Sequence, residues 1–60
     1  MDMTCLLNIT AIMKSTFDRG SATDIQALAD QMFAQYPGSD RDELVRVIEQ
    51  SLIVVGGRAL

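Results

Sequence analysis

The stretch SATDIQALADQMFAQY, residues 21–36, carries the most regular pattern in the chain and decides the fold class. Its apolar side chains recur every three or four residues, at Ile25, Leu28, Ala29, Met32, Phe33 and Tyr36. That recurrence places one apolar side chain per turn on a single face of a helix, while aspartate and glutamine residues occupy the other faces. We therefore predict an amphipathic helix over residues 22–36 that packs its apolar face against the rest of the protein.

Both ends of this helix carry local signals. Ser21 or Thr23 is expected to cap the start, with Asp24 in the first turn, where the helix dipole favours a negative charge. At the other end, Pro37 disfavours the helical conformation of the residue before it, and Gly38 supplies a turn. The helix is therefore expected to stop at this turn.

Another helix is predicted over residues 40–54, with Ser39 as its N-cap. The short connection favours antiparallel neighbours, so this helix and the preceding one form an αα-hairpin. Ile53 falls in the polar half of the pattern, so either the helix ends before it or another subunit covers it. The run 52–55 is also β-prone, which leaves a short terminal strand as the alternative, and residues 58–60 read as a tail.

The beginning of the chain predicts a helix over residues 3–16, with apolar side chains spread over roughly 220° of its circumference. Its β-branched residues leave a strand as the alternative. A helix so widely apolar is usually covered on more than one side, and only two other helices are available in this chain. We therefore expect part of its surface to meet a second copy of the protein.

The size of the chain supports the same expectation. Sixty residues make one domain, residues 1–60, and a domain of this size buries only about 60% of the surface that its unfolded chain exposes. Small domains usually need a disulfide, a metal or a partner subunit as well. Cys5 is the only cysteine and histidine is absent, which favours the partner subunit.

The predicted fold is therefore all-α: a small three-helix bundle with an αα-hairpin, completed by homodimerisation. The residues predicted for self-association are Leu6, Ile9, Met13, Phe17 and Ile53.

The side chains that catalysis usually needs are scarce. With no histidine, one thiol and one lysine, the usual pairs of nucleophile and base cannot form, so we predict no enzyme, no catalytic residue and no cofactor. The acidic group around Asp40 lacks the spacing of a calcium loop, and no glycine-rich phosphate loop occurs, so no metal site is predicted.

The net charge of −3 and the scattered basic residues argue against nucleic-acid binding. The short-linked helix pair nevertheless has the gross shape of a helix–turn–helix, and a nucleic-acid-linked regulator is the alternative function. The first residues carry Asp2 where a signal peptide has basic residues, and no apolar run is long enough for a membrane span. The sequence thus predicts a small cytoplasmic interaction or regulatory protein that self-associates through an apolar helical surface.

Overall fold

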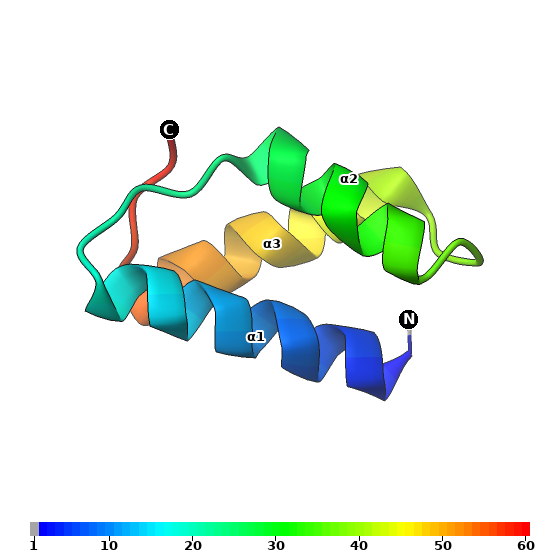
Figure 1. The fold of residues 1–60 in the computed structure, drawn as a ribbon, viewed down its shortest axis with the longest axis horizontal. Coiled ribbons are helices and arrows are strands. Elements are labelled where there is room, and N and C mark those ends of the chain that lie inside the picture. Colours follow the sequence, from blue (N-terminus) through cyan, green and yellow to red (C-terminus); the bar gives the residue numbers. More distant parts are fainter. Residues whose placement is uncertain (1) are drawn as a thin grey trace.

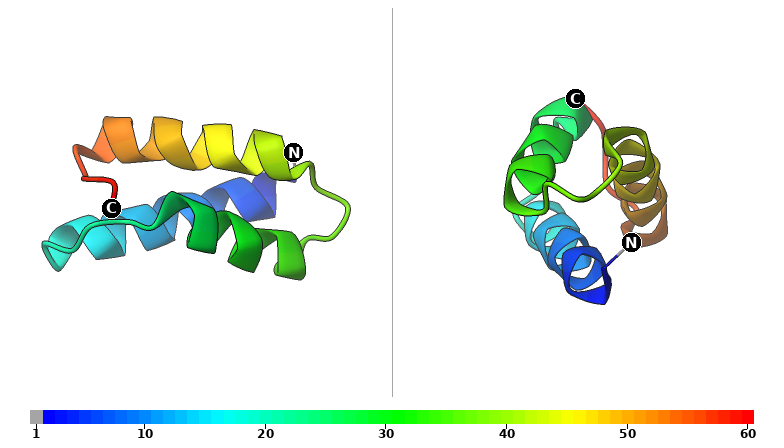
Figure 2. Two further views of the ribbon diagram at one scale, coloured as in Figure 1. Left: turned by 90° about the horizontal axis from the view of Figure 1, so that it is seen from above. Right: turned by 90° about the vertical axis from the view of Figure 1, so that its right-hand side faces the viewer.

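Three helices form the fold in the computed structural model, which describes residues 2–60. They are α1 (Met3–Asp18), α2 (Ile25–Gln35) and α3 (Arg41–Val55). Figure 1 shows α1 and α3 running in the same direction, with α2 antiparallel to both. α3 packs against each of the other helices, and the end-on view in Figure 2 shows the three as the corners of a bundle. The prediction of a compact all-helical fold is thus confirmed.

The two alternatives that invoked strands are wrong. α1 is one continuous helix despite its β-branched residues, and α3 continues without a break to Val55. The helix therefore does not end before Ile53. Tertiary packing outweighs the modest β preference of these residues, because each helix buries one apolar row in the core.

Each helix begins after an aspartate whose carboxylate accepts a hydrogen bond from the backbone of the first turn. The acceptor and donor pairs are Asp2 with Thr4 N (3.0 Å), Asp24 with Ala27 N (3.1 Å) and Asp40 with Asp42 N (2.9 Å). The predicted caps Ser21 or Thr23 and Ser39 are therefore wrong. A carboxylate adds its negative charge to the favourable end of the helix dipole, which a serine hydroxyl lacks.

The connection between α1 and α2 pairs with the C-terminal residues. Thr23 N donates to Arg58 O (2.8 Å) and Leu60 N donates to Thr23 O (2.8 Å), which makes an isolated parallel bridge. The guanidinium of Arg58 also donates to Gly20 O (3.1 Å). Residues 58–60 are therefore tied to the start of α2 instead of forming a loose tail. Because the backbone of Thr23 is committed to this pairing, α2 begins at residue 25 and not at residue 22.

Glycine ends both α1 and α3 in the same way. Gly20 and Gly56 have φ values of +72° and +76°, in the left-handed region that favours glycine. The next backbone N–H then reaches back five residues, from Ser21 to Thr16 O (3.1 Å) and from Gly57 to Leu52 O (3.0 Å). These bonds satisfy carbonyls that the end of a helix would otherwise leave open.

Polar side chains tie α2 to both neighbours. Asn8 of α1 donates to the hydroxyl of Tyr36 just after α2 (2.7 Å). Arg41, the first residue of α3, donates to Asp30 Oδ1 (2.8 Å) and to Gln26 Oε1 (2.8 Å) on α2. The second link joins the two helices of the αα-hairpin at its surface, above the apolar contacts between α2 and α3.

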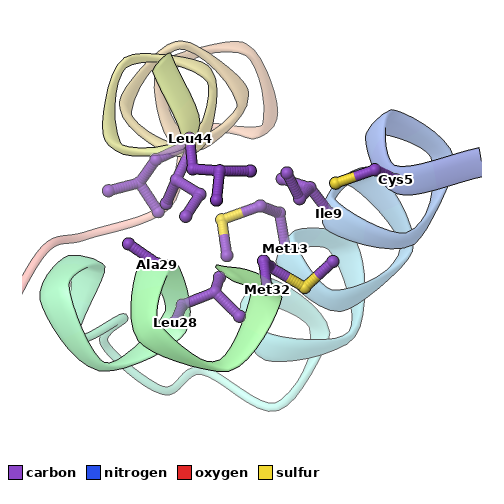
Figure 3. Packing of buried hydrophobic residues seen from close by; sticks show 9 residues of the cluster. Cys5, Ile9, Met13, Leu28, Ala29, Met32 and Leu44 are labelled. Atoms are coloured by element: carbon purple, nitrogen blue, oxygen red, sulfur yellow. The ribbon is translucent and has the colours of Figure 1, made fainter. Parts of the chain in front are cut away.

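The core takes side chains from all three helices, and Figure 3 shows them pointing into the space between the ribbons. Its members recur mostly at intervals of four residues, so each helix contributes a single row. They are Cys5, Ile9 and Met13 from α1, Leu28, Ala29 and Met32 from α2, and Leu44, Ile48 and Leu52 from α3. The other apolar side chains of residues 2–60 lie at the margin of this core or on the surface.

Candidate functional site

The residues predicted for self-association fall into two groups. Ile9 and Met13 are 0% and 1% exposed and belong to the core of the chain, where Figure 3 shows them pointing toward the other two helices. A second copy could reach them only if that core opened. Leu6, Phe17 and Ile53 remain accessible, at 36%, 48% and 71%. Ile9 and Met13 are therefore core residues and do not belong to the candidate interface.

The helical pattern could not have made this division. On a helical wheel Leu6 and Met13 lie only about 20° apart, so the sequence treats them as one face. In the structure Met13 is buried while Leu6 lies at the margin. The boundary falls between them because α3 runs alongside α1 and covers only part of its apolar arc.

A groove between α1 and α3 marks this boundary. Its volume is about 340 Å³. Its apolar lining comes from Leu6 of α1 and from Val47 and Val54 of α3. The polar residues that line it are Glu43, Arg46, Gln50 and Ser51. The groove is therefore an apolar depression with polar surroundings, which is the usual composition of a protein interface.

Exposed apolar side chains extend the groove along α1. Met3 and Leu7 are both largely exposed, and the half-exposed ring of Phe17 lies near Gly56 at the end of α3. At about 100° per residue, the exposed side chains Met3, Leu6, Leu7, Thr10 and Phe17 of α1 fall in an arc of roughly 100° that adjoins α3. We call the combined surface the α1–α3 face; it consists of Met3, Leu6, Leu7, Thr10, Phe17, Val47 and Val54.

Five members of this face were not predicted as interface residues: Met3, Leu7, Thr10, Val47 and Val54. The sequence pattern placed the four apolar ones on the apolar side of their helices, so a signal was present. It did not show which part of each apolar arc the neighbouring helix would leave uncovered. Ile53 lies about 100° beyond Val54 around α3, on the side away from α1, and does not line the groove, so it is not part of this face.

The charges around the α1–α3 face differ from those of the molecule as a whole. Lys14 lies next to the exposed stripe of α1, and Arg46 lines the groove. Glu43 is the only acidic residue that lines it, whereas the chain as a whole carries eight carboxylates and five basic side chains. The face is therefore mostly apolar, with a slight excess of basic groups at its edge.

The α2–α3 hairpin bears on the helix–turn–helix alternative. The second helix of such a pair would read DNA with its first residues. Here Arg41 turns back to Asp30 on α2, and the first turn of α3 carries Asp42 and Glu43. Carboxylates at this position would face phosphates at a Coulombic cost. The arrangement links α2 to α3 and gives no support to DNA reading.

Cys5 is the only thiol, and the structure places it in the core. Burial, reinforced by the negative charge of Asp2, raises the pKa of the Cys5 thiol above its ordinary value. Because the thiolate is the reactive form, the side chain acts as a small apolar residue at neutral pH.

A hollow with a volume of about 610 Å³ lies at the hairpin end and is lined by residues 35–39 with Asp2, Asp40 and Glu43. Asp2 and Asp40 already accept hydrogen bonds as helix caps. Within residues 2–60, no three side chains of histidine, cysteine, aspartate or glutamate lie together as a metal site requires. The acidic character of this end is thus explained by capping.

Comparison with models of protein families, with curated proteins and with solved structures finds no match for this chain. None of the helices in residues 2–60 combines the length and the hydrophobicity needed to cross a bilayer. The candidate site therefore stands on its geometry alone.

Proposed function

We propose that this protein is a small, non-enzymatic interaction protein of the regulatory kind, which acts as a homodimer formed through the α1–α3 face. The proposal includes a cytoplasmic location, since a single unpaired thiol suits a reducing compartment. The observation that supports it best is the continuity of the face: an apolar groove between two helices opens onto an exposed apolar stripe that follows α1.

The extent of this surface suits a subunit interface. Isolated apolar residues are normal on protein surfaces, but a contiguous patch on two neighbouring helices is typical of interaction sites. A stable interface takes about 800 Å² from each partner, which is about a fifth of the 3843 Å² that this chain exposes. A dimer of so small a protein must therefore use a whole face, and the α1–α3 face combines apolar character with a depression.

Absolute mass by light scattering, over a range of concentrations and with reductant present, tests the proposal. We expect a dimer for the unmodified chain and a monomer for Phe17→Asp, because an unpaired carboxylate buried in an apolar interface costs roughly 3–5 kcal/mol. Since each 1.4 kcal/mol is about tenfold in affinity, the dimer should weaken by at least about a hundredfold.

Phe33→Asp is the matched control. Phe33 is similarly exposed but lies on α2, outside the α1–α3 face, so this variant should remain a dimer. Leu7→Asp is a second test of the face, in case Phe17→Asp prevents folding. Leu7 is more exposed than Phe17, so its substitution disturbs the fold less, and we again expect a monomer by light scattering. A monomeric unmodified chain, or a dimer that survives both substitutions in the face, would contradict the proposal.

A further inference from the structure

The exposed stripe of α1 is symmetric about its middle. Met3, Thr10 and Phe17 are spaced seven residues apart, so they return to nearly the same side of the helix, with a drift of about 20° per step. Thr10 is exposed and lies halfway between the two large apolar side chains. Leu7 and Lys14 lie along one edge of this row, three and four residues from Thr10.

We propose that two copies pair through antiparallel α1 helices, with the twofold axis passing beside Thr10. This rests on the proposed homodimer and adds its arrangement. Met3 and Phe17 lie about 10.5 Å on either side of Thr10 along the helix, because each residue rises about 1.5 Å. The axis therefore brings Met3 of each copy level with Phe17 of the other, which is the reciprocal contact that a twofold interface requires.

The apolar groove gives this pairing a second component. Leu6, which lines the groove, lies one turn from Met3 on α1. When Phe17 of the second copy comes level with Met3, the exposed half of its ring reaches the mouth of the groove beside Leu6. Phe17 thus fills apolar space on the other copy that the isolated chain leaves open. The small side chain of Thr10 at the crossing lets the two helices approach closely.

Charge separates the antiparallel from the parallel arrangement. Parallel helices would place both Lys14 side chains at the same level, and both Asp2 carboxylates as well. In the antiparallel arrangement the two lysines lie about 12 Å apart along the axis. Each then lies level with Leu6 of the other copy. The like charges therefore move apart, and the two helix dipoles run in opposite directions, which is favourable.

The arrangement fixes which positions come close, so single cysteines can test it. Leu7 of one copy and Lys14 of the other lie on the same edge of the paired helices, and their positions along the helix axis differ by about 1.5 Å. The Met3 positions of the two copies lie about 21 Å apart along the axis in the antiparallel dimer, but directly opposite in a parallel one. Thr10 meets its counterpart in both.

The experiment oxidises the variants Met3→Cys, Thr10→Cys and an equal mixture of Leu7→Cys with Lys14→Cys. The free thiols are then blocked before denaturation, and the covalent products are weighed by intact mass spectrometry. The unmodified chain, whose buried Cys5 is also present in every variant, is the control. We expect crosslinked Thr10→Cys, a mixed dimer of the Leu7 and Lys14 variants at least about tenfold over their self-dimers, and no crosslinked Met3→Cys.

The outcomes separate the arrangement from the dimer itself. Crosslinking of Met3→Cys as fast as Thr10→Cys would show parallel helices and overturn the inference while the dimer remains. A dimer by light scattering in which none of the variants crosslinks would show that another face is used. A monomer by light scattering would overturn the dimer and, with it, any arrangement of its helices.

Discussion

Replacing Ile9 and Ile53 by valine tests the division of apolar residues between core and surface. Both changes delete one methyl group from the same residue type within a helix, so differences in helix propensity largely cancel. Ile9 is fully buried, and Ile53 is exposed on α3. Ile9→Val should therefore lower the free energy of unfolding by about 1 kcal/mol, from the lost burial and the small cavity. Ile53→Val should change it by less than about 0.5 kcal/mol.

Thermal and urea unfolding followed by circular dichroism, at one fixed protein concentration, would measure both variants. In a domain of this size, about 1 kcal/mol corresponds to a shift in Tm of roughly 4–8 °C, which is well resolved. Light scattering of Ile9→Val should show the unmodified mass, because this residue no longer belongs to the candidate interface. Equal losses for the two variants, or a larger loss for Ile53→Val, would refute the assignment of Ile9 to the core.

Three further predictions concern the helix ends and the buried thiol. Gly56→Ala should lower the free energy of unfolding in urea by about 1–2 kcal/mol, because the φ of Gly56 is +76°. Gly38→Ala, with open space around the residue, should lower it by less than about 0.5 kcal/mol. Asp24→Ala should lower the free energy of unfolding by about 1 kcal/mol, because α2 loses its N-cap. An equal loss for Ser21→Ala would show that Ser21 caps the helix instead. Because the folded pKa of Cys5 lies above its ordinary value of 9.0, the unfolded chain releases this proton first. The free energy of unfolding should then fall as the pH rises above about 9, and Cys5→Ala should remove that part of the slope.

The sequence predicted the helices well because their signals are local. The apolar recurrence around Met32 and the turn at Pro37 and Gly38 depend on residues within a few positions of one another. The caps were harder, because a serine and an aspartate stand close together before each of α2 and α3, and both residue types are good caps. Only the backbone geometry shows that Asp24 and Asp40 take the role.

Contacts between distant parts of the chain left no such signal. The pairing of Thr23 with the C-terminal residues joins positions more than thirty apart, and it shortens α2 at its start. A single bridged pair of residues has no periodicity from which its pairing could be predicted.

The sequence by itself determined that the chain is helical and where its turns fall. It also showed that the first helix has more apolar surface than one neighbour can cover. These properties follow from local turn residues and from the periodicity of side chains around a helix. Only the tertiary structure decided which part of that surface is covered. Met13 and Leu6 are nearly equivalent on the wheel of α1, and they differ because α3 packs over one and leaves the other at the edge of a groove. The direction from which a neighbouring helix approaches depends on the packing of all three helices together, and no single helix contains that information.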